Sequence, residues 1–127
     1  MLDKKKFYIN GKWVPPFKKN DFEVINPSSE EVFAIISLGG KEDINIAVKA
    51  AKDAFDNWKD TKKEERIIFL EKLLKIYKKR FNEMAEAMSK EMGAPIDYAT
   101  TVHASSGQSH IEDFILRLKN FKFEESF

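Results

Sequence analysis

Two histidines are the residues whose type and spacing first suggest metal chemistry. His103 and His110 lie seven positions apart, which places both on one face of a helix. A zinc ion needs further ligands at tetrahedral distances, and no neighbouring acidic or histidine pattern supplies them. We therefore interpret both histidines as solvent-facing or hydrogen-bonded side chains.

This sequence lacks the residues that thiol chemistry requires and the glycine motif that is typical of dinucleotide binding. Its 127 residues include no cysteine, which removes disulfides, thiolate nucleophiles and thiolate metal ligands together. No window reads Gly-x-Gly-x-x-Gly, and Gly39-Gly40 is predicted to be only a loop into a helix. The sequence therefore gives no catalytic residue and no cofactor-binding residue.

Composition and charge argue against several classes of partner. The 22 basic and 21 acidic side chains leave a net charge of +1, so no global field favours nucleic acid or an anionic membrane. No apolar run approaches the ~20 residues of a membrane span. The basic start at Lys4-Lys5-Lys6 is not followed by the ~7 to 15 apolar residues of a signal peptide. We expect a soluble, cytoplasmic protein.

The first chain elements are predicted to form a short β-hairpin. Asn10-Gly11 separates two alternating segments, Phe7–Ile9 and Lys12–Val14. Asn-Gly between such segments is the strongest short signal for a type I′ turn, because both of its residues accept positive φ.

A second strand pair is predicted to follow. Phe22–Ile25 ends at Asn26-Pro27, where proline stops the ladder and opens a turn, and Val32–Ser37 is the returning strand. Residues 7–37 are thus predicted to be a β-hairpin region.

Residues 41–122 are predicted to be helical. Apolar residues recur at helical spacing, and we expect the widest apolar faces to bury one another between the first two helices. Thr61-Lys62-Lys63-Glu64 reads as a capping box that starts the second helix, Gly93 as a left-handed helix end, and Pro95 as the first turn of the next helix. The residues expected to be mutually buried are Phe55, Trp58, Leu70, Leu74 and Tyr77.

The order of these pieces resembles the N-terminal segment of NAD(P)-dependent aldehyde dehydrogenases. The resemblance rests on an Ile-Asn-Gly-x-Trp hairpin at Ile9–Trp13, a Val-x-Asn-Pro strand end at Val24–Pro27, a helix closing on Ala-Phe and a nearby Trp at Ala54–Trp58, Glu65-Arg66, and a Glu-x-Gly-x-Pro element at Glu91–Pro95. It implies an α/β fold for the whole enzyme. The present chain is then a mainly α-helical piece with short N-terminal β-hairpins.

The resemblance also implies which chemistry lies elsewhere. Such enzymes oxidise an aldehyde to a carboxylic acid through a cysteine nucleophile, with a glutamate base and NAD or NADP as hydride acceptor. This chain matches none of the residues that do so. We therefore expect residues 1–127 to be a single partial domain of the nucleotide-binding half, inactive alone and without a cofactor of its own.

One binding role that the resemblance implies falls on this segment. In some family members, main-chain carbonyl groups at the strand end and a carboxylate hold a monovalent cation. Val24, Ile25 and Glu91 occupy those positions. Oxygen ligands suit a hard cation, although Glu91 could also lie solvated near a helix end.

Two function classes remain open on these grounds. The chain is either a fragment of an aldehyde dehydrogenase or a free-standing helical interaction module derived from one. In both cases we expect its partner to be another copy of itself, through exposed apolar faces, or the remainder of the enzyme.

Overall fold

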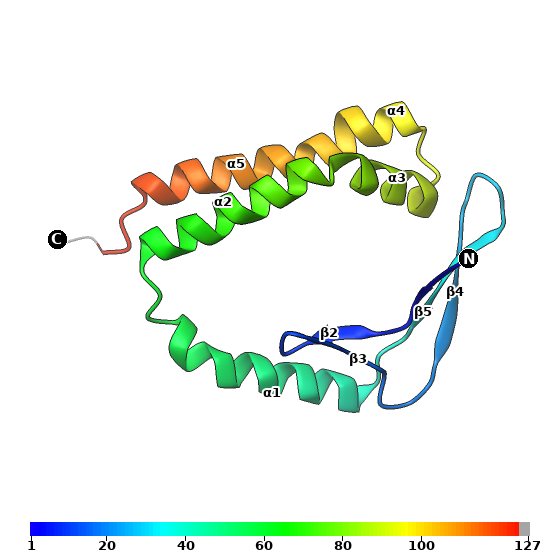
Figure 1. Cartoon of the computed structure of the whole chain (residues 1–127), viewed down its shortest axis with the longest axis horizontal. Helices are drawn as coiled ribbons and strands as arrows, with labels where there is room; N and C mark the ends of the chain where they lie inside the picture. The colour runs from blue at the N-terminus through cyan, green and yellow to red at the C-terminus, as the bar shows by residue number, and fades with distance from the viewer. Residues whose placement is uncertain (125–127) are drawn as a thin grey trace. The chain divides into compact units, whose positions relative to one another are not determined.

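The computed structural model describes residues 1–124, which form two compact units (Figure 1). The first unit consists of Met1–Asp60 together with Lys90–Met92, and the second begins at Thr61, excludes Lys90–Met92 and resumes at Gly93. The single partial domain expected across residues 1–127 stays a prediction. Within residues 1–124, no helix combines the length and the apolar character needed to cross a membrane.

A three-stranded sheet organises the first unit. β5 (Val32–Ser37) is its central strand, with β4 (Asp21–Ile25) antiparallel on one side and β1 (Leu2–Lys4) parallel on the other. The pairing of β4 with β5 confirms the predicted strand pair. β1 was not predicted, because it is only three residues long and exposed throughout, so that it has no apolar pattern to mark it.

The predicted hairpin is confirmed at its expected bounds. β2 (Phe7–Ile9) and β3 (Lys12–Val14) pair antiparallel around a two-residue turn. Asn10 has φ 51° and Gly11 has φ 73°, the two positive angles that a type I′ turn requires.

The helix α1 (Lys41–Trp58) follows the sheet, and β2 lies against it. A row of alanines on α1, including Ala47, Ala50 and Ala54, lines a shallow cavity beside the hairpin tip. Small side chains let the hairpin backbone approach the helix, whereas larger residues on the neighbouring face stay uncovered. Phe55 is 58% exposed and Trp58 is 47% exposed, so the expected burial of these two residues is wrong.

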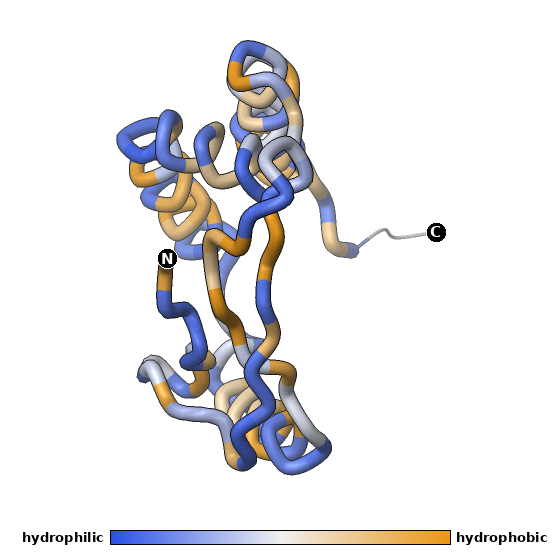
Figure 2. Tube along the Cα trace, turned by 90° about the vertical axis from the view of Figure 1, so that its right-hand side faces the viewer, coloured by the Kyte–Doolittle hydropathy of each residue, from blue (hydrophilic) through white to orange (hydrophobic). Residues whose placement is uncertain are grey.

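The second unit is helical. It contains α2 (Lys63–Lys79), most of α3 (Phe81–Met92), the single turn α4 (Ile96–Tyr98), a π-helical segment at Ala99–Ala104, and α5 (Ser105–Asn120). α2 and α5 lie side by side (Figure 1). In Figure 2, hydrophobic and hydrophilic stretches alternate along the helices, as amphipathic helices require.

The start of α2 corrects the expected capping box. The helix begins at Lys63 with Lys62 in the N-cap position, and no side chain caps it. The Thr61 main-chain carbonyl instead accepts a hydrogen bond of 3.0 Å from the Arg66 guanidinium. Pro95 likewise stands just before α4, in its N-cap position.

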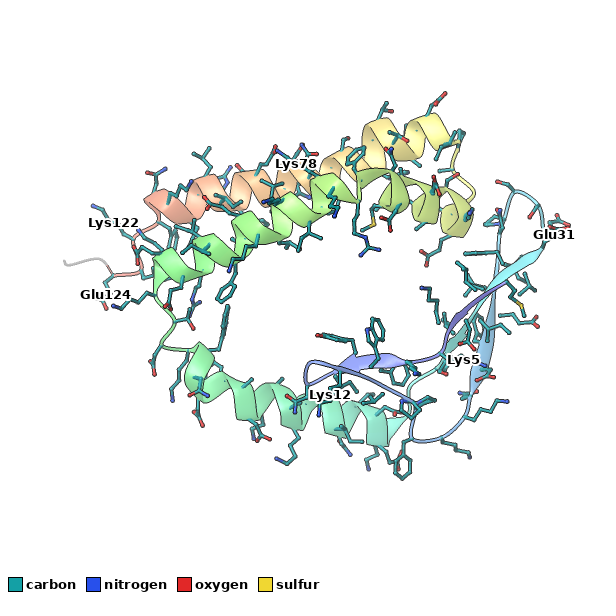
Figure 3. All side chains as sticks on the ribbon, viewed as in Figure 1. Lys5, Lys12, Glu31, Lys78, Lys122 and Glu124 are labelled. Carbon is teal, nitrogen blue, oxygen red and sulfur yellow. The ribbon has the colours of Figure 1, made fainter. Side chains whose placement is uncertain are left out.

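Tyr77 joins α2 to α5. Its ring is half-buried, and its hydroxyl donates a 2.8 Å hydrogen bond to the carbonyl of Ala104, at the end of the π-helical segment. Leu70 and Leu74 lie on the same face of α2 and are half-buried as well. Beside them, Lys78 (Figure 3) pairs with Glu112 at 2.7 Å, and this contact lowers the pKa of Glu112.

Few residues are fully buried in either unit. Ala34, Ser37 and Asp43 are buried in the first unit, and Ala85, Ala99, Ala104 and Ile115 in the second. Most of these are alanines, which mark close backbone approach rather than a core of large side chains. Much of the apolar surface therefore remains in contact with solvent.

Candidate functional site

The end of β4 carries the two carbonyl groups predicted to bind a cation. Val24 is paired with Ala34 and Ile25 with Val32, so Phe33 of β5 is an extra residue at this point. Such a β-bulge interrupts the ladder, and bulges are common beside functional sites. The backbone is thus irregular at the residues whose carbonyl oxygens the prediction invokes.

Asn26 closes β4 with a turn that its own polar groups hold. Its side-chain Oδ1 accepts a 2.9 Å hydrogen bond from the N–H of Ser28, and its carbonyl oxygen accepts one of 2.8 Å from the N–H of Glu30. Its own N–H donates to the carbonyl of Glu31 at 2.9 Å. These bonds fix the direction in which β4 ends. They also explain why asparagine stands before proline here, since its short side chain mimics a backbone turn.

Glu91 lies in the last turn of α3. The helix ends two residues later at Gly93, whose φ of 71° confirms the predicted left-handed end. The side chain of Glu91 is exposed, and Lys90–Met92 belongs to the same compact unit as β4. Its approach to the carbonyl groups of Val24 and Ile25 stays a prediction.

A cavity of about 440 Å³ opens beside this strand end. Asn26, Ser29, Glu31 and Lys90 contribute its polar lining, with Val32 and Phe33 as apolar neighbours. Glu31 is labelled in Figure 3 at the start of the returning strand. The polar lining combines one acid and one base with the Ser29 hydroxyl and the Asn26 amide. It can therefore bind polar groups.

The histidines do not assemble a metal site. His103 is half-buried with its ring edge against Tyr98, at 5.1 Å between ring centroids, and His110 is exposed on α5. In the described part of the chain, no three His, Cys, Asp or Glu side chains are grouped so that they could hold a metal ion. A cation held mainly by main-chain carbonyls would not require such a group.

Asp43 is a buried carboxylate that sequence reasoning missed. At the N-terminus of α1 it accepts hydrogen bonds from the N–H groups of Gly40, at 2.9 Å, and Phe17, at 2.8 Å. These bonds, with the Gly40 bond the larger contribution, lower the pKa of Asp43. The Gly40 contact is one half of a capping box and could have been expected from a glycine followed by an acid three residues later. The hydrogen bond from Phe17 could not have been expected, because no local sequence pattern indicates a contact between residues 26 positions apart.

This arrangement bears on nucleotide binding. Gly39-Gly40 before a helix is the one place among residues 1–124 where a glycine pair precedes a helix N-terminus, the usual location of a phosphate site. Here the negative charge at the helix start is supplied by Asp43, and the Gly40 N–H already donates to it. The start of α1 therefore does not fit a nucleotide phosphate.

Residues 13–125 match the family model described as the aldehyde dehydrogenase family. The chain belongs to this family. Its sequence is 39% identical over 127 residues to a 3-succinoylsemialdehyde-pyridine dehydrogenase from Pseudomonas sp., covering 99% of the chain and 27% of the relative.

Solved aldehyde dehydrogenases agree with this family in fold. A crystal structure of an aldehyde dehydrogenase from Bartonella henselae is 50% identical and has a TM-score of 0.98, over 100% of this chain and 27% of that one. One from Pseudomonas syringae, solved with NAD⁺ and octanal, is 32% identical with a TM-score of 0.94, over 97% of this chain and 25% of that one. The chain thus spans about a quarter of the length of these aldehyde dehydrogenases, and its α/β fold class is that of their N-terminal segment.

Proposed function

We propose that the chain supplies the N-terminal part of an NAD(P)-dependent aldehyde dehydrogenase. In the complete enzyme an aldehyde is oxidised to a carboxylic acid and the nicotinamide cofactor accepts the hydride. The observation that carries the proposal is the family match over residues 13–125, which covers almost the whole chain. The Pseudomonas relative matches 99% of this chain, but the match spans only 27% of that relative's length. The part played by these residues is structural: a sheet, a hairpin and a set of helices on which the rest of the enzyme rests.

Alone, the chain neither oxidises aldehydes nor binds nucleotide. Two features support this part of the proposal. The sequence has no cysteine to attack the aldehyde carbon. At the start of α1, after Gly39-Gly40, the Asp43 carboxylate already accepts the Gly40 N–H that a phosphate would need. A phosphate there would meet a carboxylate of like charge, which is strongly unfavourable at short range.

Calorimetric titration of the chain with NAD⁺ and with NADP⁺ tests this statement, together with an absorbance assay for aldehyde-dependent reduction of the nucleotide. A full-length family member measured beside it is the positive control. We expect no heat of specific binding and no turnover. Saturable binding of one nucleotide per chain would disprove the inactive-fragment proposal.

A monovalent cation bound by the carbonyl oxygens of Val24 and Ile25 and by the Glu91 carboxylate is part of the same proposal. The bulge at the end of β4 supports it, because it interrupts the ladder at these carbonyl groups. The ion would join the strand end to the end of α3. We further propose a cytoplasmic location and association of the isolated chain through its exposed apolar faces.

A further inference from the structure

The hydroxyl group of Ser37, at the end of β5, is a buried polar group that the fold leaves without a partner. Ser37 is 7% exposed, and its Oγ atom has no hydrogen-bond partner among residues 1–124. A buried hydroxyl that makes no hydrogen bond is costly, and most buried polar groups in native proteins bond to the protein or to a bound molecule. The Ser37 side chain therefore indicates a ligand that the chain itself does not supply.

Ser37 lines a cavity of about 460 Å³ within the first unit. The other lining residues are three lysines, two aspartates and the pair Pro15-Pro16, and we call this cavity the Ser37 pocket. Its volume lies in the range of small-molecule sites, roughly 300 to 1,000 Å³. The pocket thus combines a buried hydrogen-bond donor, charged side chains and an apolar wall.

An ion pair crosses β5 beside Ser37. Ser37 is paired with Asp21 of β4, and on the other side of β5 Lys5 directly follows the β1 residue that is paired with Ile36. The Lys5 ammonium (Figure 3) lies 3.9 Å from the Asp21 carboxylate, so its side chain reaches across the middle strand and helps to bury the hydroxyl. Because ion pairs near the surface contribute little to stability, Lys5 can move aside to admit a ligand.

The charges of the Ser37 pocket favour a ligand with one negative charge. Lys5 lies 3.1 Å from Asp3, and Lys19 lies 3.5 Å from Asp21, so two of the lysines are paired with the two aspartates. Lys6 makes no ion pair within the described residues 1–124, and it supplies the remaining positive charge. A monoanion is the complement of this lining, whereas a doubly charged phosphate would also meet the two carboxylates.

We propose that the Ser37 pocket binds a short-chain monocarboxylate. One carboxylate oxygen accepts a hydrogen bond from the Ser37 hydroxyl and the other accepts one from the Lys6 ammonium, and hydrogen bonds to charged groups are the stronger ones. Pro15 and Pro16 form the apolar wall against which the alkyl chain of the ligand lies. All of these groups belong to the first unit, and the inference does not depend on the proposed function.

Ligand-observed saturation-transfer NMR of the full chain at neutral pH tests this proposal, because it detects weak binding whatever the size of the protein particle. The probe is sodium butanoate, with 1-butanol as the uncharged control and inorganic phosphate as a competitor. Ser37→Ala removes the hydroxyl and Lys6→Gln removes the unpaired charge. Lys4→Gln makes the same change of charge at a residue that is not part of the Ser37 pocket, and it is the matched control.

We expect saturable transfer to butanoate and none to 1-butanol. Ser37→Ala should weaken binding by about tenfold or more, because it removes a hydrogen bond to a charged group. Lys6→Gln should weaken it by about threefold or more, and Lys4→Gln should leave it unchanged. The Ser37→Ala variant should fold like the wild type, as circular dichroism can check, because its lost hydroxyl has no partner in the described part of the chain.

Four results would overturn the inference. The first two are a lack of saturable transfer to butanoate and equal affinity of the wild type and Ser37→Ala. The third is displacement of butanoate by phosphate at concentrations below those at which butanoate binds, which would indicate a general anion site. The fourth is an affinity that falls as the protein concentration rises, which would assign the pocket to a carboxylate of a second copy. Nucleotide binding by the isolated chain, in contrast, would disprove the proposed function and leave this inference standing.

Discussion

Replacing Gly107 by alanine should reveal how closely α2 and α5 pack. A Cβ atom at Gly107 would lie 2.5 Å from the hydroxyl oxygen and 3.0 Å from the Cζ atom of Tyr77. Both distances are shorter than van der Waals contact. The same hydroxyl donates to the carbonyl of Ala104 at 2.8 Å, so the tyrosine cannot move aside without lengthening that bond.

The expected loss of stability follows from three contributions. Alanine in place of glycine inside a helix stabilises by about 1 kcal/mol. Overpacking costs about 1 to 3 kcal/mol, and displacing the tyrosine hydroxyl costs a further 0.5 to 1.5 kcal/mol or so for the hydrogen bond. The sum predicts that Gly107→Ala lowers the free energy of unfolding by about 0.5 to 3.5 kcal/mol.

Urea denaturation of a double-mutant cycle with Tyr77→Phe separates this contact from other effects. Phenylalanine removes the atom that lies 2.5 Å from the new methyl group, so Gly107→Ala should cost at least about 1 kcal/mol less in the Tyr77→Phe background than in the wild type. Additive effects of the two substitutions would refute the steric argument. Increased stability of Gly107→Ala in the wild-type background would refute it as well.

Three further substitutions test separate features. Because hydrogen bonds lower the pKa of Asp43 below its ordinary value of 3.8, this carboxylate stabilises the fold above that pH and loses its contribution as the pH falls through the lowered pKa. The difference in urea midpoint between wild type and Asp43→Asn should therefore be largest near neutral pH and shrink below about pH 4, whereas a constant difference would exclude the linkage. Gly93→Ala should destabilise by about 1 to 2 kcal/mol, since Gly93 has φ 71°, and an unchanged thermal midpoint would contradict this. Glu91→Gln should weaken binding of Na⁺ or K⁺, measured by calorimetry, with Glu86→Gln on the same helix as the control; equal affinities in both variants would remove Glu91 from the ligand set.

The sequence predicted turns and element ends correctly where one or two residue types determine the backbone angles. The turn at Asn10-Gly11 and the end of α3 at Gly93 both require positive φ, and few residue types accept it. The β4 and β5 strands were predictable for a similar reason, because proline after Asn26 cannot continue a ladder. In these places one or two residues are sufficient to predict where a turn forms or an element ends.

Contacts between distant residues could not be predicted in this way. The carboxylate of Asp43 accepts a hydrogen bond from the N–H of Phe17, 26 residues earlier. β1 pairs in parallel with β5, although β2, β3 and β4 lie between them in the sequence. The predicted cap at Thr61 was wrong although it depended only on neighbouring residues. Its sequence pattern was right, but the helix begins at Lys63, so its hydroxyl is one position too early to serve.

In the candidate site and on α1, too, features set by neighbouring residues could be predicted and those that depend on distant contacts could not. The end of β4 was expected from Asn26-Pro27, whereas the bulge at Phe33 and the exposure of the Phe55 side chain were not. A helical period shows that a face is apolar, but it does not show which surface lies against it.

The exposure of Ile44, Val48 and Phe55 therefore has a physical meaning beyond the wrong burial prediction. These three large apolar side chains share one face of α1 by their spacing, and each is more than half exposed. Exposed apolar patches mark interaction sites in soluble proteins. A solvated helix needs no such patch, and polar residues would serve there at no cost to helix formation. The hairpin lies beside the neighbouring alanine face and leaves the large side chains of Ile44, Val48 and Phe55 exposed. If maleimide labels the thiol of Val48→Cys at the same rate at every protein concentration, this face of α1 takes no part in the proposed association of the isolated chain, and the reasoning fails.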